Sequence, residues 1–130
     1  MTARLPPVTI SEHDGVRYLH LGTPWVQGSM RLAAPAVIDL AYVQRMLSSL
    51  LWLPPAALGS GCAVQLGLGA GTITRFTLQQ LRLPTTVVEI NPQVVQACHA
   101  WFRLPRSHER LQVEVADAGA WLERALQSPL

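Results

Sequence analysis

The chain of 130 residues contains ten arginines, no lysine and eight acidic residues, and its formal net charge at pH 7 is +2. These charges are scattered and do not form the basic run that nucleic-acid binding requires, so we expect no nucleic-acid partner. Apolar residues make up 49% of the chain. No apolar stretch reaches the roughly 20 residues of a membrane span, and the N-terminus has no signal-peptide core. The composition therefore predicts a cytoplasmic chain of about one domain, without a membrane partner.

The N-terminal part of the sequence predicts a β-hairpin. Two β-prone runs, residues 8–12 and 16–21, flank Asp14-Gly15, a pair typical of a tight turn with positive φ. Apolar residues occur on both faces of the second run, so we expect the hairpin to pack against the rest of the chain. Residues 22–30 are rich in turn-forming residues and predict a connecting loop.

A long helix is expected between residues 35 and 53. Pro35 suits the first turn of a helix, and Pro54-Pro55 ends it. The apolar stripe of this helix is wide and extends to Trp52, which predicts burial between two layers or contact with a partner chain. Residues 56–61 predict a flexible hinge.

From residue 62 onward, short apolar runs alternate with helical patterns. The expected strands are residues 62–66, 85–90 and 111–115, and the expected helices follow Gly71, begin at Asn91-Pro92 and cover residues 120–126. This alternation is typical of an α/β fold with a parallel sheet.

The candidate functional site is the glycine-rich stretch after the first of these strands. Gly67, Gly69 and Gly71 let the backbone turn sharply and let a ligand approach it closely. Glu89 ends the next expected strand, where a carboxylate can accept hydrogen bonds from ribose hydroxyls. Close packing of strand and helix would explain the glycines by themselves. The acid at the second strand favours a nucleotide site.

The order of these motifs resembles the spermidine synthase (polyamine aminopropyltransferase) family over about residues 8–125. The resemblance is carried by Gln27-Gly28-Ser29-Met30, Tyr42, Gly67-Leu68-Gly69-Ala70-Gly71, Val88-Glu89-Ile90-Asn91-Pro92 and Ala116-Asp117-Ala118. It implies an α/β fold in two parts. Residues 1–34 would form an N-terminal β-hairpin and connector. Residues 35–130 would form a partial nucleotide-binding domain, the first half of a methyltransferase-like Rossmann sheet with flanking helices.

The resemblance also implies a transferase of polyamine biosynthesis that uses S-adenosylmethionine or decarboxylated S-adenosylmethionine as co-substrate. The implied roles are Gln27 at the donor site, Tyr42 near the substrate pocket, Gly67, Gly69 and Gly71 in the loop under the donor, Glu89 on the ribose and Asp117 beside the adenine. From the residues alone, Asp117 is also open to interpretation as the N-cap of the last helix. No metal site is expected.

Two features differ from the family pattern. Ala70 occupies the position of an Asp that usually holds the amino group of the family's substrates, and the sequence ends at Leu130, before the fourth strand that the catalytic Asp follows. We therefore expect donor binding and assign no catalytic residue, because deprotonating an ammonium group needs a positioned acceptor. Two alternatives stay open. One is a small-molecule methyltransferase, favoured by Ala70 because a neutral acceptor needs no carboxylate, and the other is a non-catalytic relative that acts in assembly.

The strand order of the family predicts an open sheet edge. In a methyltransferase-type sheet the order is three, two, one, four, so strand 62–66 would lie at an edge with unpaired backbone groups. We expect either that the chain is a fragment of a longer protein or that it forms a homo-oligomer along this strand or the Leu-rich helix. Cys62 and Cys98 are both expected to be buried thiols.

Overall fold

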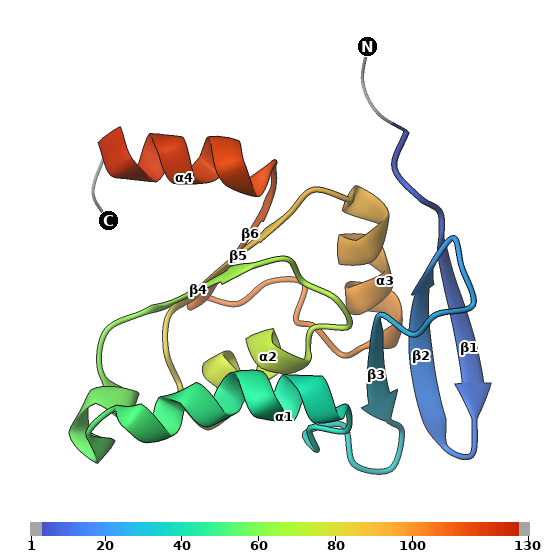
Figure 1. Cartoon of the computed structure of the whole chain (residues 1–130), viewed down its shortest axis with the longest axis horizontal. Helices are drawn as coiled ribbons and strands as arrows, with labels where there is room; N and C mark the ends of the chain where they lie inside the picture. Colours follow the sequence, from blue (N-terminus) through green and yellow to red (C-terminus); the bar gives the residue numbers. More distant parts are fainter. Residues whose placement is uncertain (1–3, 128–130) are drawn as a thin grey trace.

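The computed structural model describes residues 4–127 and contains two three-stranded sheets. The antiparallel sheet consists of β1 (Val8–His13), β2 (Val16–Leu21) and β3 (Gly28–Arg31), and the parallel sheet consists of β4 (Ala63–Leu66), β5 (Thr85–Glu89) and β6 (Leu111–Val115). The α-helices are α1 (Ala41–Leu47), α2 (Thr72–Arg75), α3 (Pro92–Trp101) and α4 (Ala118–Gln127). Figure 1 shows α1 and α4 on opposite sides of the parallel sheet and α3 between the two sheets.

The hairpin forms as the sequence predicts. Asp14 and Gly15 adopt φ values of 49° and 75°, and His13 pairs with Val16 across the turn. Two consecutive positive φ angles match the right-handed twist of the strands that the turn joins. Leu19 of β2 is fully buried, which confirms that the hairpin packs against the rest of the chain.

The prediction of a loop over residues 22–30 is wrong at its C-terminal end. β3 begins at Gly28 and pairs with β2 in antiparallel register, with Leu19 opposite Gly28 and Arg17 opposite Met30. Gly28 and Ser29 have little β propensity of their own. They form a strand because tertiary packing buries this segment, and Met30 joins the main hydrophobic core.

The helix after Pro35 is shorter than predicted. The α-helix starts at Ala41, and the chain then continues as the 3₁₀ turns η1 (Ser48–Trp52) and η2 (Pro55–Gly59). Asp39 holds the preceding segment against β3, because its carboxylate accepts hydrogen bonds from Ser29 and Arg31. Trp52 is 88% exposed, so the wide apolar stripe is uncovered here.

The parallel sheet confirms the predicted α/β class. Its strands follow the order β4-β5-β6, with Ala63 opposite Thr85 and Thr85 opposite Leu111. After α2 the chain continues as a π-helical turn, η3 (Phe76–Gln80), and α3 starts with Asn91 as its N-cap. Thus the predicted strands, and the helix start at Asn91-Pro92, are all present.

One hydrophobic core joins the two sheets. It contains residues from the hairpin sheet and from the parallel sheet with its helices, among them Leu19, Met30, Val87, Cys98 and Phe102. Cys98 is buried as predicted, whereas Cys62 precedes β4 and is exposed, so the expectation of two buried thiols is wrong for Cys62.

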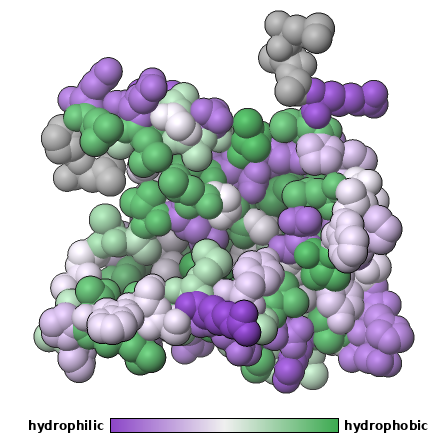
Figure 2. Space-filling model, in the orientation of Figure 1, coloured by the Kyte–Doolittle hydropathy of each residue, from purple (hydrophilic) through white to green (hydrophobic). Residues whose placement is uncertain are grey.

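β4 lies at an edge of the parallel sheet, as the sequence predicts. Its Val64 and Leu66 are among the exposed large hydrophobic residues, and Figure 2 shows hydrophobic surface between α4 and α1. Among residues 4–127, no helix has both the length and the hydrophobicity that crossing a bilayer requires.

Candidate functional site

The glycine loop connects β4 to α2 at the carboxyl end of the parallel sheet. Gly67, Gly69 and Gly71 have φ values of 88°, 56° and 76°. Residues with a Cβ rarely adopt this left-handed region, so the three glycines are needed for the backbone path that the loop follows. Gly71 is the N-cap residue of α2.

Glu89 is bonded to this loop. Its Oε1 atom accepts a hydrogen bond from the Leu68 backbone N–H at 3.0 Å, and its Oε2 atom accepts one from the Asn91 backbone N–H at 2.9 Å. The side chain is only partly buried. Because each carboxylate oxygen has two lone pairs, Glu89 keeps acceptor capacity on its open side.

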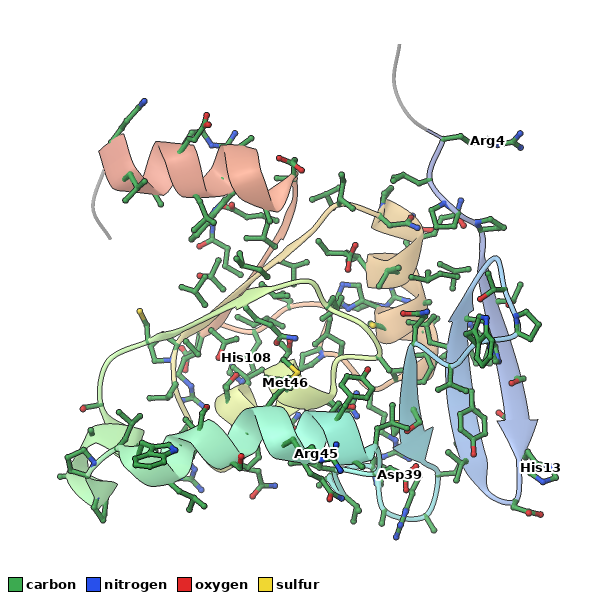
Figure 3. The ribbon with its side chains drawn as sticks, viewed as in Figure 1. Arg4, His13, Asp39, Arg45, Met46 and His108 are labelled. Carbon is green, nitrogen blue, oxygen red and sulfur yellow. The ribbon has the colours of Figure 1, made fainter. Side chains whose placement is uncertain are left out.

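A cavity of about 120 Å³ lies beside the loop. Its lining includes Gln27, Tyr42, Met46, Gly67 and Gly69. Figure 3 shows Met46 projecting from α1 toward the space between this helix and the parallel sheet. The cavity is half open, and the connector before β3, α1 and the glycine loop form its walls.

Gln27 and Tyr42 are linked directly. The Tyr42 hydroxyl donates a hydrogen bond to the Gln27 carbonyl oxygen at 2.9 Å, and the Gln27 backbone N–H donates to the Leu19 carbonyl oxygen at 2.8 Å. Partial burial raises the pKa of the Tyr42 phenol above its ordinary value, so the hydroxyl stays a donor at neutral pH. The Gln27 side chain is left to face the cavity and solvent.

Gly28 makes the closest approach between the hairpin sheet and the glycine loop. A Cβ atom at this position would lie 2.5 Å from the Ala70 Cβ and 2.7 Å from the Ala70 backbone N. Only glycine therefore fits here without a shift of the backbone. This role of Gly28 was not predicted from the sequence, although a glycine in a strand is a sign of close backbone approach.

Arg75 and Cys98 donate hydrogen bonds to carbonyl oxygens of the glycine loop. This role was not predicted from the sequence for either residue. Arg75 Nη1 donates to the carbonyl oxygens of Ala70 and Phe102, both at 2.7 Å, and the Cys98 thiol donates to the Gly69 carbonyl oxygen at 3.1 Å. Burial lowers the pKa of Arg75 and raises the pKa of Cys98 to about 12. The sequence does contain one sign of it, because Arg75 is a lone arginine in a helix pattern that is otherwise typical of burial.

Asp117 lies two residues after the end of β6. Its Oδ2 atom accepts a hydrogen bond from the Ala120 backbone N–H at 3.0 Å, so the residue caps α4. Glu89 is close by along the same sheet edge, because its carbonyl oxygen accepts a hydrogen bond from the Ala116 backbone N–H at 3.1 Å.

The predicted residues thus form two groups at the carboxyl end of the parallel sheet. Gln27, Tyr42, Gly67 and Gly69 surround the cavity, whereas Gly71, Glu89 and Asp117 do not line it. Glu89 lies on the other side of the loop backbone at Leu68, and Asp117 follows on the next strand. Carboxyl ends of parallel strands are where α/β sheets bind ligands.

Similar proteins are found in sequence and in structure. A polyamine aminopropyltransferase from Chromobacterium violaceum is 36% identical over 120 residues, which cover 92% of this chain and 44% of the relative. The protein of the same name from Neisseria meningitidis serogroup A is also 36% identical, over 124 residues. Over nine tenths of its length, the chain is thus similar in sequence to proteins named polyamine aminopropyltransferase. No protein-family model matches the sequence.

Two further similarities concern the fold and a second reaction class. The crystal structure of a probable spermidine synthase from Corynebacterium glutamicum matches with a TM-score of 0.72 at 17% identity, over 95% of this chain and 47% of that one. This likeness confirms the predicted methyltransferase-like fold. An N-terminal histidine N-methyltransferase from Emericella nidulans is 31% identical over 128 residues, or 22% of its length. This chain spans less than half of the aminopropyltransferases that it matches.

Proposed function

We propose that this chain is the donor-binding part of a spermidine synthase-like transferase and binds S-adenosylmethionine or its decarboxylated form along the carboxyl edge of the parallel sheet. In this proposal, residues 35–130 form the partial nucleotide-binding domain, and residues 1–34 contribute the hairpin and the connector that covers the loop. The substrate of the complete transferase is a small molecule, a polyamine if the reaction is aminopropyl transfer.

The observation that carries the proposal is the position of Glu89. Both of its carboxylate oxygens are held by backbone N–H groups, one of which belongs to the glycine loop. This fixes the carboxylate beside the loop, with lone pairs left for the two ribose hydroxyls. A ribose bound there would place the rest of the nucleoside on the two sides of Glu89.

The surroundings suit the two ends of such a ligand. On one side, exposed apolar side chains of Ile90 and Val115 lie near Asp117 and offer a surface for an adenine ring. On the other side, the cavity between Gln27 and Tyr42 would receive the group attached to sulfur. The glycines let the ligand pass close to the backbone between these two places.

The test is calorimetric titration of both donors into the wild-type chain and into Glu89→Gln. Loss of the charged hydrogen bonds to the ribose would weaken donor binding by about 1.5–3 kcal/mol. Glu109→Gln is the matched control, since Glu109 is exposed and lies away from the loop. Thermal unfolding of each variant shows whether the loop still folds.

Two results would refute the proposal. One is the absence of binding heat with either donor, which would leave a non-catalytic relative that acts in assembly. The other is unchanged donor affinity in a folded Glu89→Gln variant.

A methyltransferase is the second candidate function. Ala70 favours it, because the chain lacks the carboxylate that would hold a substrate amino group at this position. The likeness to a protein named as a methyltransferase agrees with this possibility. Transfer of a labelled methyl group from S-adenosylmethionine to a small-molecule library would support this candidate over aminopropyl transfer.

A further inference from the structure

We infer that the cavity beside the glycine loop selects against a positively charged donor tail, so that S-adenosylmethionine binds in preference to decarboxylated S-adenosylmethionine. The inference rests on the proposed function and names the ligand class of the same site. The two donors share the adenosyl group and the sulfonium. They differ in the tail, which carries an ammonium and a carboxylate in the first and an ammonium alone in the second.

The lining of the cavity supplies no negative charge. The lining residues that the structure describes include no Asp, Glu, Lys, Arg or His, and their polar side chains are those of Gln27, Tyr42, Gln65 and Thr72. The Tyr42 hydroxyl is a donor to a backbone carbonyl. An ammonium in this half-open cavity would lose part of its hydration without gaining a carboxylate partner from the lining, which is unfavourable.

Two carboxylates adjoin residues of the cavity lining, and both are already engaged. Asp39 precedes the cavity residue Leu40, but its Oδ1 atom lies 2.8 Å from Arg31 Nε, and its Oδ2 atom accepts a hydrogen bond from Ser29. Glu89 lies on the far side of the loop, where it binds the backbone N–H groups of Leu68 and Asn91. Neither carboxylate lines the cavity.

A buried cation is bonded to a residue of the cavity lining. The Arg75 side chain is bonded to the carbonyl oxygen of Ala70, and Ala70 lines the cavity. Arg75 is 4% exposed, and its hydrogen-bond partners are the carbonyl oxygens of Ala70, Phe102 and Pro35, with no carboxylate paired to it among residues 4–127. Its charge is therefore poorly screened and disfavours a second cation in the cavity.

Ala70, at the position of the missing carboxylate, packs closely against Gly28. Its Cβ atom faces the backbone of Gly28, and a single Cβ added at Gly28 would already lie 2.5 Å from it. Ala70 also lines the cavity, where its methyl group adds no charge. The close packing of β3 on the loop therefore brings a neutral residue to this wall of the cavity.

The first experiment is calorimetric titration of three ligands into the wild-type chain at low ionic strength, where charge effects are least screened. The ligands are S-adenosylmethionine, decarboxylated S-adenosylmethionine and 5′-methylthioadenosine, a thioether nucleoside with an uncharged tail. We expect decarboxylated S-adenosylmethionine to bind at least fivefold more weakly than each of the other two. A smaller ratio, or the reverse order, would overturn the inference.

The second experiment adds a carboxylate to the cavity. Gln27→Glu keeps the size of an exposed side chain, and Gln27 contributes its backbone, not its side chain, to the hydrogen bonds described above. We expect this variant to shift the affinity ratio at least threefold toward decarboxylated S-adenosylmethionine. Gln96→Glu on the exposed face of α3 makes the same charge change away from the cavity and should leave the ratio unchanged. Equal shifts in both variants would overturn the inference.

Failure of the inference differs from failure of the proposed function. If none of the three ligands binds, the donor site itself is wrong and both fall. If all three bind and Glu89→Gln weakens them while the decarboxylated donor is preferred, the nucleoside site stands and the charge selection is refuted.

Discussion

The guanidinium of Arg75 is bonded to the carbonyl oxygen of Ala70, so a buried cation holds the glycine loop in place from the helix that follows it. The same Nη1 atom donates to Phe102, the residue after α3. One side chain thereby connects the loop, α2 and the end of α3. Hydrogen bonds from charged donors are the stronger ones in proteins, so this connection contributes to the rigidity of the loop.

Arg75→Met is therefore expected to lower the free energy of unfolding by about 2–4 kcal/mol, because it leaves two buried carbonyl groups without their donor. Methionine keeps most of the buried volume, so the effect of a cavity stays small. Denaturant titration measures the change. Arg45→Met, on the exposed side of α1 (Figure 3), is the control and should stay within about 0.5 kcal/mol of the wild type. Equal stability of the two variants would contradict the role assigned to Arg75.

The contact between Gly28 and Ala70 predicts a steric effect. Gly28→Ala would place a Cβ atom 2.5 Å from another Cβ, so β3 or the loop must move. We expect a loss of about 1–3 kcal/mol of stability, as for other overpacked sites. Gly59→Ala is the matched control, because a Cβ atom there meets nothing within 4 Å. Thermal unfolding measures the melting temperature of each variant. Equal melting temperatures would mean that the clash is absent.

Cys98 predicts a loss of stability at alkaline pH. The thiol has an ordinary pKa of 9.0, and burial raises its pKa in the folded chain to about 12. Between these values the folded state binds more protons than the unfolded state, so the free energy of unfolding falls as pH rises. The slope is at most about 1.4 kcal/mol per pH unit. Burial also raises the pKa of Tyr42, which acts in the same direction above pH 10.0.

The variant that tests this is Cys98→Ser, whose hydroxyl can still donate to Gly69 but does not ionise in this range. Denaturant titrations from pH 8 to pH 11 should show a smaller decline in stability for the variant than for the wild type. Identical slopes would mean that Cys98 does not cause the alkaline loss.

The exposed edge of β4 predicts self-association. Ala63 and Gly67 donate their backbone N–H groups to the carbonyl oxygens of Pro84 and Val88 beside them, so the alternating Val64 N–H points to the open side. Such edges pair with other chains. We expect the chain to form dimers or larger species in light scattering after size exclusion. Val64→Pro removes an outward N–H and should reduce association, whereas Val64→Thr keeps that group. A stable wild-type monomer would count against this prediction.

Local sequence signals determined the elements that depend on short-range geometry. Asp14-Gly15 specifies a turn with two positive φ angles, and Asn91 followed by Pro92 specifies a helix start, whatever lies nearby. The buried run of β5 predicts a covered parallel strand in the same way, because apolar residues on both faces need a layer on each side. These features, with the glycine spacing, were enough for the fold class, whereas the family resemblance also needed motifs such as Gln27-Gly28-Ser29-Met30 and Ala116-Asp117-Ala118.

Tertiary structure decided the features that depend on contacts between distant residues. β3 forms where Gly28 packs against Ala70. α1 starts later than predicted because Asp39 is bonded to Ser29 and Arg31 of β3. Local propensity predicts neither contact. The same holds for Arg75: its place among apolar helix residues is a sign of a buried charge, but only the fold shows that this charge is bonded to the glycine loop. The sequence by itself predicted which residues would face a nucleoside. Only the packing of the hairpin sheet on the glycine loop determined which charges surround the cavity, because electrostatic environment depends on distance in space and on burial.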